Sequence, residues 1–142
     1  MLDIDMELAS GIAAFEAKEF AQARRLLSPL AEQGNAQAQY RLAIMAQVGL
    51  GMVKNCASAV KWMRAAAEQG LGLAQHGLGF MYFQGECTRA DPVEAAKWFR
   101  LAADQGLAGS QATLATMYEQ GVGVERDLAQ ARKWQELAAQ SH

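Results

Sequence analysis

The chain has 142 residues, of which 51% are hydrophobic and 20% are charged, and its formal net charge is −2. A chain of this length and composition can bury enough apolar surface to fold without a metal or a set of disulfides. Its small net charge gives no reason to expect a nucleic-acid partner or an anionic membrane, because both favour a concentrated positive field.

The N-terminal residues Met-Leu-Asp-Ile-Asp-Met-Glu are acidic and lack the basic and apolar regions of an export signal. No apolar run in the chain approaches the ~18 residues of a membrane span. Cys56 and Cys87 occupy unrelated positions of the repeat described below, which is not the pattern of a disulfide framework. We therefore expect a reduced, cytoplasmic protein without membrane insertion.

The chain repeats itself every 36 residues, as three tryptophans show most clearly. The columns that keep this interval are Trp62, Trp98 and Trp134; Lys61, Lys97 and Lys133; Met45, Met81 and Met117; and Gly34, Gly70 and Gly106. A period of about 20 to 50 residues is the signature of repeat architectures. Aromatic residues that recur once per repeat belong to the core, so we interpret all three tryptophans as structural.

The first hairpin is predicted from two helical patterns. Apolar residues fall at helical spacing between residues 3 and 16, at Ile4, Leu8, Ile12 and Phe15. A second helix is predicted from about residue 20 to residue 33, with Gly34 as its left-handed C-cap. Pro29 lies inside this helix, where it removes a backbone donor and should kink the helix.

Three further hairpins follow with complete start and stop signals. Their second helices are predicted to begin after Asn55, Asp91 and Asp127, whose side chains suit an N-cap. Glycines in the turns, such as Gly49 and Gly121, are expected to have positive φ. The sequence thus predicts one repeat domain over residues 1–142, made of hairpins at 3–34, 36–70, 72–106 and 108–142.

Three segments carry a resemblance to a known family. Ala-x-x-x-Leu-Gly-x-Met-Tyr-x-x-Gly at 74–85, Gly-x-Gly-Val at 121–124 and Ala-x-x-Trp-x-x-x-Ala-Ala-x-Gln-Gly at 59–70 resemble the Sel-one-like repeat (SLR) family, a branch of the tetratricopeptide-like α-solenoids. Residues 36–142 hold three such units, and the first hairpin resembles an ordinary tetratricopeptide unit. The resemblance implies an all-α, right-handed superhelical α-solenoid of four antiparallel helix hairpins.

The resemblance also implies a mostly bacterial protein–protein interaction module that acts as an adaptor or scaffold, with no cofactor and no catalysis. Some relatives carry a cysteine pair that joins the end of one repeat to the start of the next. The matching columns here hold Ala66 and Ala74, so the resemblance does not imply that disulfide.

The sequence does not favour an enzyme or a nucleic-acid-binding repeat. For an enzyme or metal site, His76 has no carboxylate or Cys within one helical turn, and His142 is the last residue. We therefore predict no catalytic, metal or cofactor residues. For a nucleic-acid-binding repeat, the first helix of each hairpin would have to be basic, because these helices line the groove of tetratricopeptide-like stacks. Arg41 is their one basic residue, so nucleic acid is not the expected partner.

The expected binding site is the concave groove lined by the first helices, where an unidentified protein or peptide would bind. The predicted groove residues are Tyr40, Ile44, Gln47, His76, Phe80, Phe83, Gln84, Thr116, Glu119 and Gln120. Phe80 and Phe83 lie off the apolar stripe of their helix, which is typical of interface anchors. In the alternative interpretation, both rings wedge between neighbouring first helices.

The end of the repeat series bears on self-association. One column of the second helices reads Leu27, Met63, Phe99 and then Gln135, so it becomes polar in the last unit. Polar terminal repeats act as caps. We therefore expect a monomer or weak dimer, with a self-associating scaffold as the alternative function.

Overall fold

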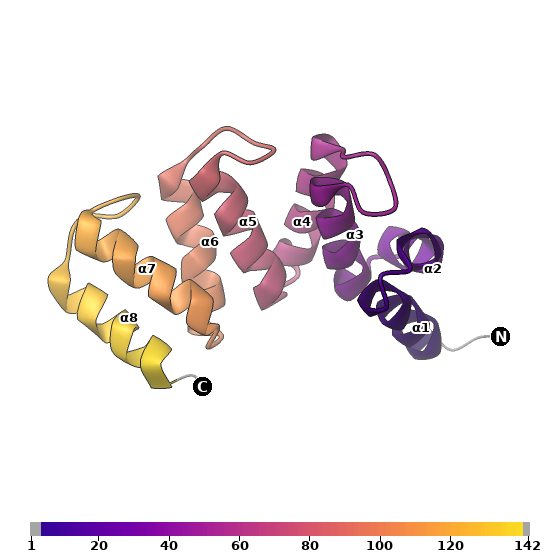
Figure 1. Ribbon diagram of the computed structural model, residues 1–142. Coiled ribbons are helices and arrows are strands. Elements are labelled where there is room, and N and C mark those ends of the chain that lie inside the picture. The colour runs from indigo at the N-terminus through magenta and orange to yellow at the C-terminus, as the bar shows by residue number, and fades with distance from the viewer. Residues whose placement is uncertain (1–3, 141–142) are drawn as a thin grey trace. The chain divides into compact units, whose positions relative to one another are not determined.

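The protein, seen here in a computed structural model, is described over residues 4–140 and consists of helix hairpins in that range, with no strand (Figure 1). Each of its eight described helices has 13 residues: α1 (Ile4–Glu16), α2 (Phe20–Glu32), α3 (Ala36–Val48), α4 (Cys56–Glu68), α5 (Gly72–Gln84), α6 (Pro92–Asp104), α7 (Ala108–Gln120) and α8 (Leu128–Gln140). The chain divides into two compact units, the first ending at Leu71 and the second beginning at Gly72.

Side-chain caps fix where the second helices begin. Asn55 Oδ1 accepts a hydrogen bond from the Ser58 backbone N–H at 3.0 Å, and Asp91 Oδ1 accepts one from Glu94 at 3.2 Å. Asp127 Oδ1 caps α8 in the same way, through the Gln130 backbone N–H at 3.1 Å. All three predicted N-caps are confirmed. The bonds satisfy backbone donors that have no partner inside the helix.

The turns need left-handed backbone at fixed places. Gly49 and Gly121 have φ of 86° and 70°, as predicted for turn glycines. In the third hairpin the second turn glycine is replaced by Cys87, which nevertheless adopts a φ of 63°. A side chain with a Cβ is strained in this conformation. The repeat geometry therefore imposes the turn even where the sequence lacks the glycine.

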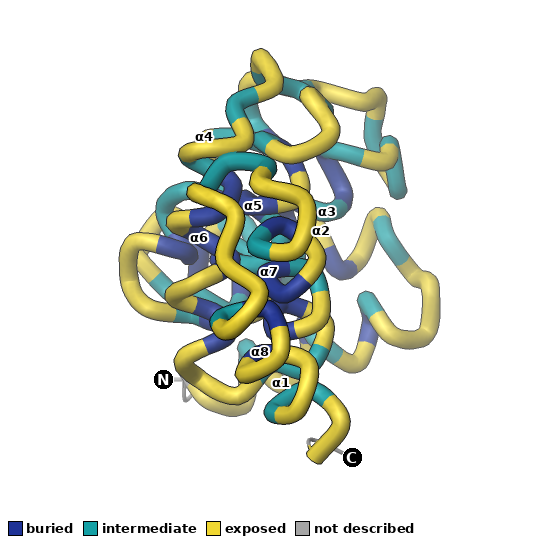
Figure 2. The backbone as a smooth tube through the Cα atoms, turned by 90° about the vertical axis from the view of Figure 1, so that its left-hand side faces the viewer, coloured by how far each residue is buried: buried dark blue, intermediate teal, exposed yellow. Residues whose placement is uncertain are grey.

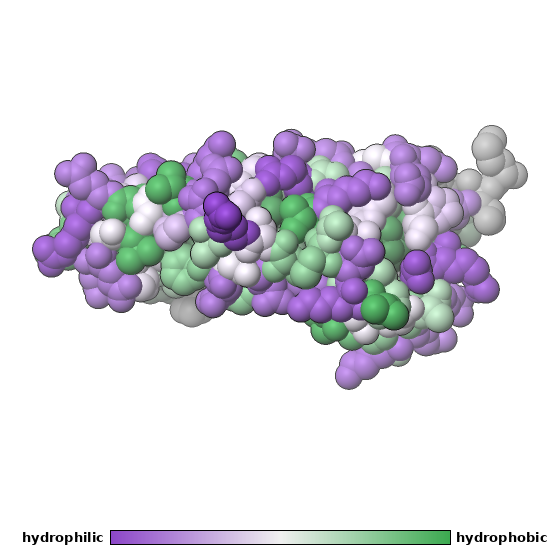
Figure 3. Space-filling model, turned by 90° about the horizontal axis from the view of Figure 1, so that it is seen from above, coloured by the Kyte–Doolittle hydropathy of each residue, from purple (hydrophilic) through white to green (hydrophobic). Residues whose placement is uncertain are grey.

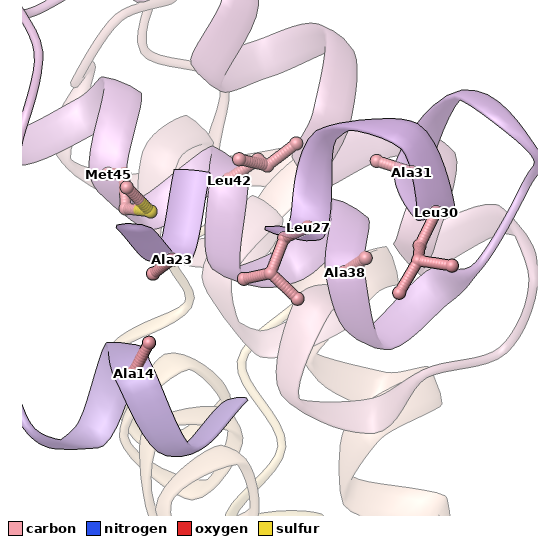
Figure 4. Close-up of a cluster of buried hydrophobic side chains, with 8 residues drawn as sticks. All are labelled: Ala14, Ala23, Leu27, Leu30, Ala31, Ala38, Leu42 and Met45. Atoms are coloured by element: carbon pink, nitrogen blue, oxygen red, sulfur yellow. The ribbon is translucent and has the colours of Figure 1, made fainter. Parts of the chain in front are cut away.

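In the first unit the core lies where α2 meets its neighbours. Figure 4 shows the buried side chains of this cluster, which come from α1 (Ala14), α2 (Ala23, Leu27, Leu30 and Ala31) and α3 (Ala38, Leu42 and Met45). Leu27 and Met45 are fully buried. Alanines let the helices approach, and the longer side chains fill the remaining space. The helix α2 continues past Pro29 to Glu32.

The second unit packs two hairpins, α5 with α6 and α7 with α8, and α6 also packs on α7. Its large buried side chains at these contacts include Phe99, Met117 and Trp134. Figure 2 shows the alternation of buried and exposed residues along the helices that amphipathic packing requires. Trp98 and Trp134 are buried as predicted, whereas Trp62 of the first unit is only partly buried. The right-handed superhelix and the single domain stay predictions, because both concern the placement of the units.

The expectation of unpaired cysteines is wrong. Cys56 and Cys87, the two cysteines of the chain, are both disulfide-bonded. The two cysteines occupy unrelated positions of the repeat. A disulfide needs only suitable geometry between two thiols, and equivalence of repeat position is not part of that requirement.

Candidate protein-interaction surface

The predicted groove residues fall into two sets, one in each unit. Tyr40, Ile44 and Gln47 lie on α3 of the first unit and are all partly buried. The other seven lie on α5 and α7 of the second unit, where Phe80, Phe83, Gln84, Thr116, Glu119 and Gln120 are exposed and His76 is partly buried. A single groove that joins both sets stays a prediction.

On α5 the two phenylalanines differ in how they are held. Phe80 is 42% exposed and Phe83 is 36% exposed. The Phe83 ring packs edge-on against Phe99 of α6, with 6.2 Å between ring centroids, so part of this side chain belongs to the hairpin core. The ring contacts of the described chain include no such partner for Phe80. Phe80 is therefore the more available of the two anchors.

Gly79 explains why Phe99 can lie so close to α5. A Cβ added at Gly79 would lie 3.0 Å from Cδ1 of Phe99, which is tighter than ordinary van der Waals contact. The Phe99 ring thus packs on bare backbone, between His76 and Phe83 on either side. The His76 ring is edge-on to Phe99, with 5.3 Å between centroids.

His76 is fixed by a hydrogen bond between helices. Its Nδ1 atom lies 2.7 Å from Oγ of Ser110, a fully buried residue on α7. Burial lowers the pKa of His76 below its ordinary value, because the charged imidazolium loses solvation. The side chain is therefore neutral near pH 7. Its hydrogen bond to Ser110 connects α5 to α7.

The residues on α7 make local hydrogen bonds and remain exposed. Thr116 Oγ1 donates to the Ala112 carbonyl at 3.2 Å. The Glu119 carboxylate accepts a hydrogen bond from the Gln135 side chain of α8 at 3.2 Å. These contacts lie on the surface, so a partner could exchange them at little cost.

In the first unit, Tyr40 lies beside a cation on its own helix. The guanidinium of Arg41 is 5.9 Å from the centroid of the Tyr40 ring. Burial raises the pKa of Tyr40, and the positive charge of Arg41 partly opposes this rise. Tyr40 is neutral at physiological pH and offers a hydroxyl together with a ring face.

The charges on the first helices remain few in the structure. Helix α5 contains no Asp, Glu, Lys or Arg, α7 contains only Glu119, and α3 contains only Arg41. A phosphate backbone would find few cations on these three helices. The described residues also hold no group of three His, Cys, Asp or Glu side chains that could bind a metal ion.

Sequence reasoning missed a column of buried glutamines. Gln39, Gln75 and Gln111 are each 4–5% exposed and keep the 36-residue interval. Gln111 Nε2 donates to the Ala103 carbonyl at 3.1 Å, which ties α7 to the end of α6. Gln39 does the same between α3 and the Ala31 carbonyl of α2, also at 3.1 Å. The period itself was the signal that could have revealed these residues.

Sequence reasoning also missed a hollow beside the second helix of the third hairpin, α6. In the second unit, a groove of about 380 Å³ runs between α6 and α7, and we call it the α6–α7 groove. Its lining consists of Val93, Ala96, Lys97, Arg100 and Leu101 of α6, Leu114 and Tyr118 of α7, and Gly123 and Val124 of the following turn. In the face that Figure 3 shows, hydrophobic side chains (green) likewise lie exposed among hydrophilic ones (purple).

These helix hairpins define the protein as an all-α repeat protein of the solenoid class. The model of the Sel1 repeat family matches residues 36–71, 72–107 and 108–141. The chain therefore belongs to the Sel1 repeat family, as its sequence motifs indicated. The first hairpin lies outside the matched residues.

Solved structures agree with this assignment. A Sel1 repeat protein from Oxalobacter formigenes is 34% identical, with a TM-score of 0.90 over 94% of this chain and 55% of that one. The protective antigen c5321 of uropathogenic Escherichia coli, which displays an SLR fold, is 37% identical, with a TM-score of 0.91 over 97% of this chain and 30% of that one. This chain thus spans about half or less of those two proteins. No curated protein sequence matches it.

A more distant structure shows the fold alone. The cysteine-rich protein B of Helicobacter pylori is 20% identical, with a TM-score of 0.68 over 87% of this chain and 88% of that one.

Sel1 repeat proteins are generally protein-interaction scaffolds, and the family fold is non-enzymatic. None of the helices in residues 4–140 is long and apolar enough to span a membrane.

Proposed function

We propose that this chain is a non-catalytic adaptor that binds a peptide or protein on the exposed face of its first helices. The observation that carries the proposal is the 42% exposure of Phe80 on a helix without charged residues. Large aromatic residues left in water cost free energy, and interfaces use such residues as anchors.

The neighbours of Phe80 suit a binding face of mixed character. Phe83 adds a second aromatic edge that the core holds in position through Phe99. The His76 ring is held in place by its hydrogen bond to Ser110, so this part of the surface is preorganised. A preorganised surface loses less conformational entropy on binding. On α7, Thr116 and Glu119 are exposed polar residues.

Site-specific crosslinking tests this face directly. The photoreactive residue p-benzoylphenylalanine is placed at Phe80, and as a matched control at Glu136, an exposed position on α8. In cells that naturally produce the protein, the proposal expects one defined crosslinked protein from the Phe80 site and not from Glu136. Equal crosslinking patterns at both sites would refute the assignment of the α5 face.

Compartment and oligomeric state are separate parts of the proposal. The disulfide state of Cys56 and Cys87 favours an oxidising compartment over the cytoplasm that the sequence indicated. Trapping of thiols in intact cells decides between them, because cytoplasmic cysteines would be alkylated. We also propose a monomer or weak dimer, because the column that holds Leu27, Met63 and Phe99 becomes polar at Gln135, which is exposed. Sedimentation that shows long filaments would instead favour the self-associating scaffold.

A further inference from the structure

The α6–α7 groove lies on different residues from the proposed binding face, and one side of α6 forms its wall. Val93, Ala96, Lys97, Arg100 and Leu101 follow one another at helical steps of three and four, so all lie on the same side of this helix. Val93 is 67% exposed and Leu101 is 41% exposed. This wall of the groove therefore presents aliphatic side chains to solvent.

The opposite wall is held rigidly. Leu114 of α7 is buried at its base, and Val124 of the following turn is partly buried. Gly123 has a φ of 74°, and a Cβ there would collide with the backbone carbonyl of Pro92 at the start of α6. The turn therefore packs directly against the beginning of α6, and the groove is a fixed feature of the unit.

The charges lining the groove are both positive. Arg100 donates to the Tyr118 hydroxyl at 2.8 Å and makes no ion pair within residues 4–140. Lys97, whose side chain is 64% exposed, has a weak pairing with Glu94 at 3.8 Å. No carboxylate lines the groove, although Glu125 and Asp127 line an adjoining hollow together with Arg126. The Arg100 guanidinium also lies 5.7 Å from the centroid of the Trp134 ring. The groove thus combines an apolar floor with a guanidinium that has no carboxylate partner within residues 4–140.

The fold does not require a groove with an apolar and cationic lining, as the first unit shows. There a hollow of about 190 Å³ occupies the corresponding place, with Leu42 in the position of Leu114. Arg24 takes the position of Ala96, Ser28 that of Arg100, and Glu32 also lines the hollow. The repeat therefore creates the hollow in both units, while its apolar and cationic lining belongs to the second unit.

We propose that the α6–α7 groove is a second docking surface, which takes a partner peptide with a large apolar side chain next to an aspartate or glutamate. The apolar side chain would lie between Val93, Leu101 and Leu114. The carboxylate would pair with Arg100, whose planar guanidinium suits two-point recognition of a carboxylate. Charge complementarity selects this occupant, because the groove offers two cations and no anion.

The probe is a displayed library of random 12-residue peptides, selected against the full chain. The proposal expects the selected peptides to carry an acidic residue within four positions of Leu, Ile, Met or Phe. Their affinity should fall about tenfold or more in Arg100→Glu and in Val93→Asp. Both residues are exposed, so these variants should keep the circular dichroism of the parent. Peptides with Lys in place of the acidic residue should regain binding to Arg100→Glu.

Matched controls separate this groove from the first-helix face. Arg24→Glu, at the corresponding hollow of the first unit, and Phe80→Ala should leave the affinity of the selected peptides unchanged. Amide shifts of the unmodified protein with bound peptide should cluster at 93–101 and 114–124. Failure to select any peptide, selection without acidic residues, or loss of binding only in Phe80→Ala would overturn the proposal. The last result would leave the proposed function intact.

Discussion

His76 on α5 and Ser110 on α7 are joined across the second unit, with 2.7 Å between Nδ1 and Oγ. Ser110 is fully buried, and the same column holds the alanines Ala38 and Ala74 in the earlier repeats. The column is therefore polar only at Ser110 among these three repeats. The pair holds the imidazole beside the exposed Phe80 and Phe83.

This pair predicts a pH-dependent stability. Burial lowers the pKa of His76 in the folded protein, so the unfolded chain takes up the proton first as pH falls. The stabilisation is thus complete above the unfolded pKa of about 6.5 and is lost as pH falls from there toward the folded pKa. Urea unfolding at pH 7.5 and 5.5 should show a smaller loss for His76→Gln than for the parent. A folded pKa of His76 at or above 6.5 by NMR would contradict this prediction.

Because Gly79 and Phe99 lie so close together, the effect of Gly79→Ala on stability should change sign with the residue at position 99. Gly79→Ala should improve helix propensity by about 1 kcal/mol but crowd the Phe99 ring, and overpacking costs about 1–3 kcal/mol. We expect a net loss of stability. In the Phe99→Met background the same change should stabilise, because the second repeat combines Ala43 with Met63 at these positions. Equal effects of Gly79→Ala in both backgrounds, measured by urea unfolding, would show that the ring is not the obstacle.

The buried glutamine column predicts a measurable loss of stability when one of its side chains is removed. Gln111→Ala removes the hydrogen bond to the Ala103 carbonyl, which keeps its bond from the Gly106 backbone N–H, so the change should cost about 0.5–1.5 kcal/mol, the usual net contribution of one hydrogen bond. Gln84→Ala, on the exposed end of α5, serves as the control and should cost under about 0.5 kcal/mol. Similar unfolding free energies for the two variants would remove the proposed role of this column.

The disulfide and the left-handed backbone of Cys87 can be separated. Cys56→Ser with Cys87→Ser should lose about 2–5 kcal/mol of stability, the usual effect of removing a native disulfide. Cys56→Ser with Cys87→Gly also lacks the disulfide, yet should be more stable than the double serine variant by about 0.5–1 kcal/mol, because glycine accepts a φ of 63°. The reverse order in thermal or urea unfolding would argue against strain at this residue.

Much of the fold was predictable because each helix carries its own boundary signals. Asn55, Asp91 and Asp127 mark helix starts, and Gly34 marks an end through its positive φ of 98°. These signals are local, so the sequence alone reveals them. The repeat period adds the hairpin pairing, because the same signals return with the same spacing.

The interpretation of the site was less complete, because it depends on contacts between helices. The contact of Phe83 with Phe99 joins α5 to α6, and neither residue's position in its own helix reveals it. The disulfide state of Cys56 and Cys87 likewise depends on distances that repeat columns do not encode. The α6–α7 groove was not predicted, because the charged residues of the second helices indicated only a face exposed to solvent.

If the α5 face binds a partner through Phe80, the variant Phe80→Ala should lose binding without losing stability. Partner capture, measured by co-purification from the cells that naturally make the protein, should fall about tenfold. The free energy of unfolding should change by under about 1 kcal/mol, as expected for a surface position. Unchanged capture, or a large stability loss with capture falling alongside it, would contradict the account and return Phe80 to a purely structural role.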